Sequence, residues 1–148
     1  MTTTIDLLIN QIVYKIKPDT IETENEEINF YLCNGTVVTM YHEPDCCEDV
    51  HIDDINGDLS NLVGHPILRA DEKISKGEEL VDTEDTYYDE SNTWTFYTLA
   101  TSAGYVDIRW HGSSNGYYSE SVDFLCEEHP TPTDILATYQ SKYPEYFL

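Results

Sequence analysis

The sequence predicts an α+β fold built on an antiparallel sheet, with about seven hairpin-connected strands and one or two short helices. Segments in which apolar and polar residues alternate recur along the chain, as expected of strands with one buried face. The dipeptides Asn34-Gly35 and Asn56-Gly57 separate such segments, and Asn-Gly is the strongest short signal for a hairpin turn. A chain of 148 residues is long enough for one core, so residues 1–148 are expected to form a single domain.

The first three strands are expected before residue 43. One spans residues 12–17 and ends at Pro18, and the acidic residues 19–27 after it are expected to form a solvated loop. A hairpin then joins a strand at 28–33 to a strand at 36–42. Side chains that share a face in these strands are Ile12, Tyr14 and Ile16; Ile28, Phe30 and Leu32; and Val38, Met40 and His42.

A fourth strand is expected over residues 48–55, with Val50 and Ile52 pointing inward. Asp58 is placed to cap a short helix that Gly64 ends. Residues 71–92 are rich in acidic side chains with few apolar ones between them, so this stretch is expected to be an exposed acidic segment.

The second half of the sequence predicts a three-stranded meander over residues 93–101, 105–110 and 117–124. In its middle strand Val106, Ile108 and Trp110 share one face. A last helix is expected to begin near Thr131 and Pro132, because proline suits the first turn of a helix. Its apolar residues are Ile135, Leu136 and Tyr139.

The charge excludes several classes of function. The chain has 7 lysine and arginine residues against 29 acidic ones, a net charge of −22. Such a charge repels nucleic acid and anionic membranes, so no direct binding to either is expected. It favours a soluble monomer and attraction to basic surfaces. The chain also lacks an apolar run of about 18 residues and a basic, apolar N-terminus, which predicts a cytosolic protein with reduced thiols.

The stretch from His42 to Asp53 is the first candidate site, because thiolates and imidazoles are the usual ligands of zinc. It contains His42, Cys46 and Cys47, and Cys126 and His129 form a second pair with Cys-x-x-His spacing downstream. Two such pairs from separate elements predict a structural zinc site that joins parts of a sheet. Cys33 is expected in the core, and His51, His65 and His111 are substitutes for a fourth ligand.

Other readings of these residues stay open. A zinc metalloenzyme is one, although the His-x-Glu and Pro-Cys-x-x-Cys spacing of deaminases is not present. A thiol nucleophile at Cys46 or Cys47 with His51 as its base is another, although nearby carboxylates would raise the pKa of a thiol. The Asp53–Asp58 stretch resembles part of a calcium loop but has no closing glutamate. The region from Arg109 to Ser119, with small residues between aromatic ones, is a candidate surface for protein recognition.

Several motifs carry a resemblance to known proteins. Tyr-His-Glu-Pro-Asp-Cys-Cys-Glu-Asp-Val at 41–50, Asn-Gly-Asp-Leu at 56–59, Trp-Thr-Phe-Tyr at 94–97 and Arg-Trp-His-Gly at 109–112 look like those of a group of small acidic bacteriophage proteins. The likeness covers roughly residues 38–70 and 93–124. Less closely, the chain resembles the phage anti-CRISPR inhibitors of type II-A Cas9, which include an acidic zinc-binding protein. Residue by residue, the resemblance supports only His42, Cys46 and Cys47 as metal ligands.

The resemblance implies a non-enzymatic anti-CRISPR protein that binds Cas9 in the cytoplasm of an infected bacterium, blocks the loading of target DNA and holds a structural zinc. The charge agrees with this, because Cas9-type effectors hold nucleic acid in positively charged channels. An acidic inhibitor or DNA mimic that acts on another host nucleic-acid enzyme is the alternative hypothesis.

Overall fold

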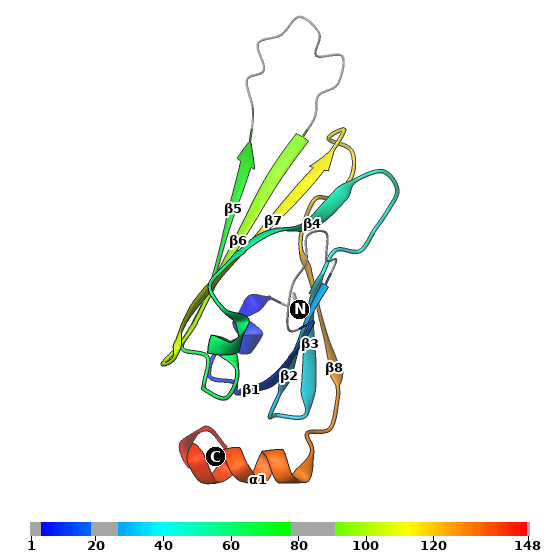
Figure 1. The fold of residues 1–148 in the computed structure, drawn as a ribbon. Helices are drawn as coiled ribbons and strands as arrows, with labels where there is room; N and C mark the ends of the chain where they lie inside the picture. Colours follow the sequence, from blue (N-terminus) through cyan, green and yellow to red (C-terminus); the bar gives the residue numbers. More distant parts are fainter. Residues whose placement is uncertain (1–3, 19–26, 78–90, 148) are drawn as a thin grey trace, which may run out of the picture.

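The structure, a computed structural model, describes residues 4–18, 27–77 and 91–147. In the part of the chain that the structure describes, two four-stranded antiparallel sheets face each other, with one α-helix at one end (Figure 1). This confirms the predicted α+β fold, which is mainly β, and the described residues form eight strands where about seven were expected.

The first sheet has the order β1-β2-β3-β8, with bounds Val13–Lys17, Glu27–Leu32, Thr36–Tyr41 and Asp123–Glu128. The second sheet has the order β4-β7-β6-β5, with bounds Asp49–Asn56, Gly104–Ser114, Ser91–Thr101 and Arg69–Gly77. The 3-10 helices are η1 (Ile5–Leu8), η2 (Leu59–Leu62) and η3 (Pro144–Tyr146), and the α-helix is α1 (Thr133–Lys142). Among the described residues, no helix is both long and apolar enough to span a membrane.

The core fills the space between the two sheets. Every second residue of the central strands points inward, so β2 buries Ile28, Phe30 and Leu32 as predicted. On the facing sheet Trp110 is almost fully buried, and its indole Nε1 donates a hydrogen bond to Sδ of Met40 at 3.0 Å. This contact joins β7 to β3 through the centre of the core.

The predicted face of the first strand is wrong in part. A β-bulge lies between Val13 and Lys15, and it interrupts the alternation of side chains. As a result Val13 and Ile16 are both buried, while Tyr14 lies half-exposed on the outside. The alternation of residue types does not reveal the extra residue of a bulge, so the expected face was shifted.

The predicted meander is also wrong at its third strand. β8 begins only at Asp123 and pairs with β3 of the other sheet, where Thr39 lies opposite Leu125. Residues 115–122, here called the crossover segment, run from the second sheet to the first. Alternation indicates that a strand exists but not which strand it pairs with, so the neighbour in sequence was a wrong choice of partner.

Part of the expected acidic segment is a strand. β5 (Arg69–Gly77) pairs along its length with β6, and its residues 71–76 are exposed. This strand is held by the pairing of its backbone groups with β6, because within residues 69–76 only Ala70 is buried. The remainder of that segment, 78–90, and the expected loop at 19–26 lie outside the described residues.

The predicted helices form with small changes. Asp58 caps η2 by accepting a hydrogen bond from the backbone N–H of Ser60 at 2.9 Å, but the helix is 3-10. α1 begins at Thr133, and Thr131 instead donates to the carbonyl of Leu32 at 3.0 Å. This hydrogen bond ties the segment before α1 to the β2–β3 hairpin. The apolar residues expected on the helix, Ile135, Leu136 and Tyr139, are half-buried.

Candidate functional site

His42 follows directly on β3, and its imidazole pairs with the carboxylate of Glu48. Nε2 of His42 lies 3.1 Å from Oε1 of Glu48, and Nδ1 donates to the carbonyl of Ser121 at 2.7 Å. The His42 side chain is 7 % exposed and that of Glu48 is 1 % exposed. Both ring nitrogens are therefore engaged with acceptor oxygens, and His42 connects the end of β3 with the crossover segment.

Glu48 also closes the bend that contains the two cysteines. Its carboxylate accepts hydrogen bonds from the backbone N–H groups of Asp45 at 2.6 Å and Cys46 at 3.3 Å. These hydrogen bonds, of which that from Asp45 has the largest effect, lower the pKa of Glu48 to about 2. The hydrogen bond with His42 also lowers this pKa, whereas burial of the carboxylate raises it. Cys46 and Cys47 are exposed and bonded to each other as a disulfide, whereas the sequence suggested two reduced thiols.

Cys126 and His129 lie elsewhere. Cys126 is opposite Val38 on β3, and the backbone N–H of His129 donates to the carbonyl of Gly35 at 2.9 Å. Gly35 precedes β3 and His42 follows it, so these points are roughly 20 Å apart at the strand rise of about 3.3 Å per residue. The structure thus brings His42 close to the bend with Cys46 and Cys47, and leaves His129 at the other end of β3.

These predicted ligands do not converge on one point, and no group of three or more His, Cys, Asp or Glu side chains in the described ranges is arranged to hold a metal ion. The structural zinc stays a prediction for metal analysis. His51, His65 and His111, the substitute ligands, contact Asp49, the Tyr143 hydroxyl and Asn92 respectively. Cys33 lies in the core as predicted, and burial raises the pKa of its thiol to about 11.

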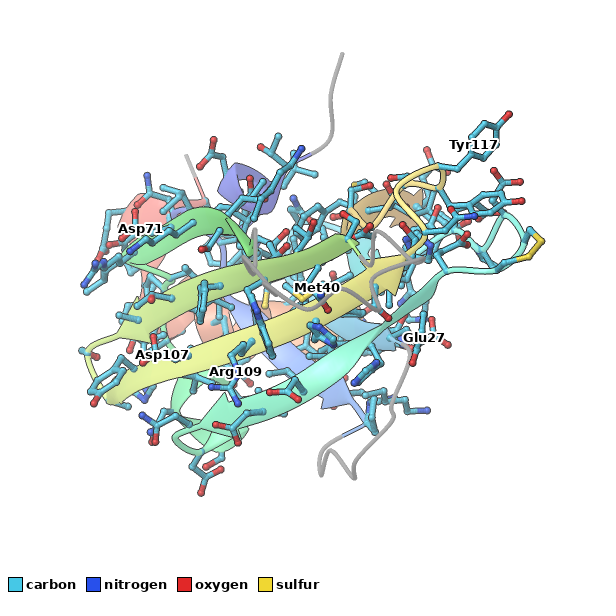
Figure 2. The ribbon with its side chains drawn as sticks, turned by 90° about the horizontal axis from the view of Figure 1, so that it is seen from above. Glu27, Met40, Asp71, Asp107, Arg109 and Tyr117 are labelled. Carbon is cyan, nitrogen blue, oxygen red and sulfur yellow. A yellow bond between two sulfur atoms is a disulfide. The ribbon has the colours of Figure 1, made fainter. Side chains whose placement is uncertain are left out.

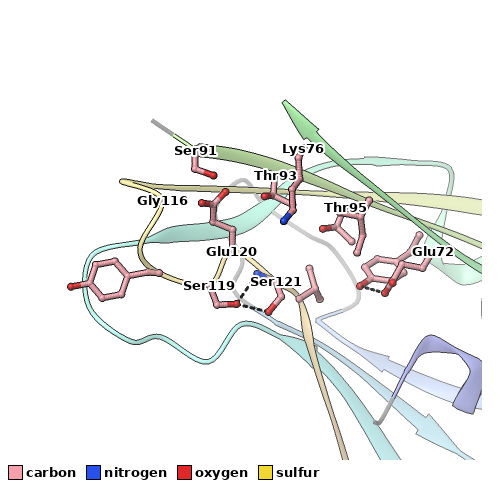
Figure 3. Close-up of a pocket in the computed structure, with 13 residues that line it drawn as sticks. Glu72, Lys76, Ser91, Thr93, Thr95, Gly116, Ser119, Glu120 and Ser121 are labelled. Atoms are coloured by element: carbon pink, nitrogen blue, oxygen red, sulfur yellow. Dashed lines mark hydrogen bonds between the residues drawn. The ribbon is translucent and has the colours of Figure 1, made fainter. Parts of the chain in front are cut away.

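A polar pocket lies on the inner face of the second sheet, beside the crossover segment (Figure 3). Its volume is about 500 Å³. β5 and β6 form one wall, and the crossover segment forms the other. The side chains that give the pocket its chemistry are Glu72, Lys76, Thr93, Thr95, Tyr97 and Glu120.

Glu120 is the most unusual of these residues, because it is a carboxylate that is only 8 % exposed. Its Oε2 accepts a hydrogen bond from the hydroxyl of Ser114, while its Oε1 is buried without a hydrogen-bond partner in the described residues. The crossover segment packs closely on β7 here: a Cβ added to Gly112 would lie 2.7 Å from Cβ of Glu120 and 2.8 Å from its carbonyl oxygen. The glycine at position 112 is what allows Glu120 to enter the pocket.

The other wall also carries polar groups where a core would be expected. Thr93 and Thr95 are buried on the same face of β6 as Tyr97. The hydroxyl of Tyr97 donates to Oε2 of Glu72 at 2.9 Å, and burial, followed by this contact, raises the pKa of Tyr97. Sequence reasoning missed the pocket, although inward threonines in the predicted strand 93–101 were a signal for it.

The outer face of the first sheet forms a second candidate surface. Glu27, Tyr41 and Asp123 lie in one row across β2, β3 and β8. Burial, and after it the charges of Glu43 and Asp123, raises the pKa of Tyr41. We call this surface the tyrosine–acid face; its residues are Glu27, Tyr31, Val37, Tyr41, Asp123, Leu125 and Glu127.

The outer face of the second sheet has a different character (Figure 2). The guanidinium of Arg109 pairs with Asp53 and lies over the ring of Trp94, 5.5 Å from its centre. Arg69 pairs with Asp71 on β5. At the tip beyond β7, Tyr117 is 82 % exposed. Both arginines on this face are thus paired with carboxylates.

Comparisons with known proteins extend this description. Neither the curated proteins nor the solved structures that were compared with the chain gave a match. A protein-family model described as "Domain of unknown function (DUF7448)" matches residues 6–124. The matched range contains His42 and Glu120 and ends before Cys126. Because it spans most of the chain, the protein belongs to the DUF7448 family.

Proposed function

We propose that this protein is a non-enzymatic binding protein whose tyrosine–acid face docks onto a basic, nucleic-acid-binding surface of another protein. The observation that carries the proposal is the combination of tyrosines and carboxylates on the outer face of β2, β3 and β8. Tyrosine supplies rigid contact area with a polar tip, and the carboxylates supply the charge that a basic partner needs.

The distribution of ion pairs supports the choice of this face. Among the described residues, the carboxylates that pair with arginine are Asp53 and Asp71, and both belong to the second sheet. On the first sheet Lys15 lies over the ring of Tyr31 at the β1 side, whereas Asp123 and Glu127 belong to the opposite edge strand. Within the described ranges, Asp123 and Glu127 form no ion pair with lysine or arginine; Asp123 accepts from the backbone N–H of Glu43 at 2.9 Å and lies 3.9 Å from Nδ1 of His42.

Leu125 adds an apolar contact to this surface. It is 42 % exposed and lies opposite Thr39, between the positions of Asp123 and Glu127 on β8. An exposed leucine between two carboxylates suits a partner whose apolar surface is rimmed by lysine or arginine. The overall charge of −22 would speed the encounter with such a partner and make the association sensitive to salt.

The partner that the sequence resemblance implies is Cas9, with the protein acting as an anti-CRISPR inhibitor in the cytoplasm of an infected bacterium. An acidic body seated in a channel that normally holds nucleic acid would block DNA loading by occupying its place. Another host nucleic-acid enzyme with a basic channel is the alternative partner. The functional contact in either case is the same face.

A binding measurement with immobilised Cas9 tests the proposal. The affinity is expected to fall between about 0.05 M and about 0.5 M salt, as the Debye length shortens. Glu127→Lys should weaken binding by about tenfold or more, because it places a positive charge on the face. Glu145→Lys, which changes the net charge equally on exposed η3, is expected to stay within about twofold of the wild type.

Equal weakening by the two variants would show that overall charge acts and that the tyrosine–acid face does not. Failure to bind Cas9 at low salt, repeated with other nucleic-acid enzymes of the host, would overturn the proposal as a whole.

A further inference from the structure

The pocket on the inner face of the second sheet contains a hydrogen-bond acceptor that the protein itself does not satisfy. Oε1 of Glu120 is buried and has no partner among the described residues, although Oε2 of the same carboxylate accepts from Ser114. Buried polar groups are nearly always hydrogen-bonded, and an unmet carboxylate oxygen is costly. An ionised carboxylate can only accept, so the missing partner must be a donor.

The charges around the pocket indicate what kind of donor fits. The ionisable groups that line it, apart from the tyrosines, are Glu72, Lys76 and Glu120, which leaves one net negative charge. The other polar groups nearby include the neutral hydroxyls of Thr93 and Thr95. A single positive charge would neutralise this set, and the field of a protein with a charge of −22 draws cations toward it.

The size of the pocket points to an organic cation. A volume of about 500 Å³ lies within the range of small-molecule sites. A bare hard metal ion would require about six or more oxygen ligands at close range. The described residues form no such group of carboxylates, whereas hydroxyls and a tyrosine ring line the walls.

We propose that this pocket binds a small organic cation whose primary ammonium group donates a hydrogen bond to the carboxylate of Glu120. The hydroxyls of Thr93 and Thr95 offer further acceptors, and Tyr97 supplies an apolar wall. Lys76 lies around the same space (Figure 3), so its charge opposes the ligand and limits the affinity. The pocket faces the interior between the sheets, so it is separate from the tyrosine–acid face.

A matched pair of small probes tests the proposal on the full chain. Aminobutanol carries the ammonium group, and butanediol replaces that group by a hydroxyl. Titration at low ionic strength, followed by amide chemical shifts in nuclear magnetic resonance spectra, is expected to show saturable changes with aminobutanol at Thr93, Thr95 and residues 119–122. Butanediol should give none of these changes.

Three variants test which side chains determine the binding of aminobutanol. Glu120→Gln keeps the shape of the side chain but removes the charge, and it should weaken the binding of aminobutanol by about tenfold or more. Lys76→Gln removes the opposing charge and should strengthen binding by about threefold. Glu128→Gln changes the net charge as Glu120→Gln does, but lies on exposed β8 away from the pocket, and should leave binding unchanged.

Three results would overturn the proposal. Equal shifts with butanediol would identify a site for polyols. Equal loss of binding in Glu120→Gln and Glu128→Gln, or shifts spread over the whole surface, would identify general attraction of counterions. Weaker binding of aminobutanol in Lys76→Gln would show that Lys76 helps to form the site and does not oppose a bound cation.

Discussion

Nε2 of His42 lies 3.1 Å from Oε1 of Glu48, and the two side chains are almost completely buried together. The pair closes the acidic bend after β3, because Glu48 also accepts the backbone hydrogen bonds of that bend and His42 reaches the crossover segment. A position that the sequence marks as a metal ligand is thus, in the structure, a hydrogen-bonded link between three segments of chain.

Replacement of His42 by alanine is expected to destabilise the fold. It removes the partner of buried Glu48 and the bond to Ser121, and a loss of this kind costs about 1–3 kcal/mol. Cys126→Ser, at an exposed position on β8, should change the free energy of unfolding by less than about 0.5 kcal/mol. Urea denaturation of the two variants measures both values.

The same pair of variants, with elemental analysis of the purified wild type, tests the predicted zinc. A structural zinc shared by His42 and Cys126 would make both substitutions strongly destabilising and would cause both to release metal. Stoichiometric zinc with a large effect of Cys126→Ser would contradict the separation of these residues along β3.

Acid is expected to weaken the contribution of Glu48. The hydrogen bonds of the bend lower its folded pKa from 4.5 to about 2, so the native state favours the ionised form. The resulting stability is present above the unfolded pKa and is lost as the pH falls from about 4.5 to about 2. The difference in unfolding free energy between the wild type and Glu48→Gln should therefore shrink over this range. A difference that stays constant down to pH 2 would contradict the assigned role of the ionised carboxylate.

The close approach at Gly112 predicts a penalty for any side chain there. A Cβ would lie within 3 Å of both the side chain and the backbone of Glu120, so Gly112→Ala must displace the crossover segment. We expect a loss of about 1–3 kcal/mol in thermal or chemical denaturation. Ser113→Ala, at the neighbouring half-buried position, is the control and should have little effect. Equal stability of Gly112→Ala and the wild type would show that the segment can move at no cost.

The sequence predicts much of this fold because its signals are local. Alternation assigned the buried faces of β2, β3 and β7, and Asn34-Gly35 located the first hairpin. The bulge at Val13 and the pairing of β8 with β3 were not predictable in this way, because both depend on contacts between distant strands.

The candidate sites, like the fold, could be predicted from the sequence only where they depend on neighbouring residues. The sequence places His42 at the end of a strand and marks it as a metal ligand, but its partner Glu48 and its distance from His129 depend on how the chain returns. Glu120 gave no signal, because it lies in a polar stretch between serines and becomes buried only where the crossover segment meets Gly112. The inward threonines at 93 and 95 were the one local sign that the face of β6 is not entirely core.

The most direct test of the proposed function is a displacement measurement, in which labelled nucleic acid is bound to Cas9 and the protein is added at low salt. We expect the wild type and Glu145→Lys to release the nucleic acid, and Glu127→Lys to require about tenfold more protein for the same release. Nucleic acid that stays fully bound while the protein saturates Cas9 would contradict competition for the basic channel.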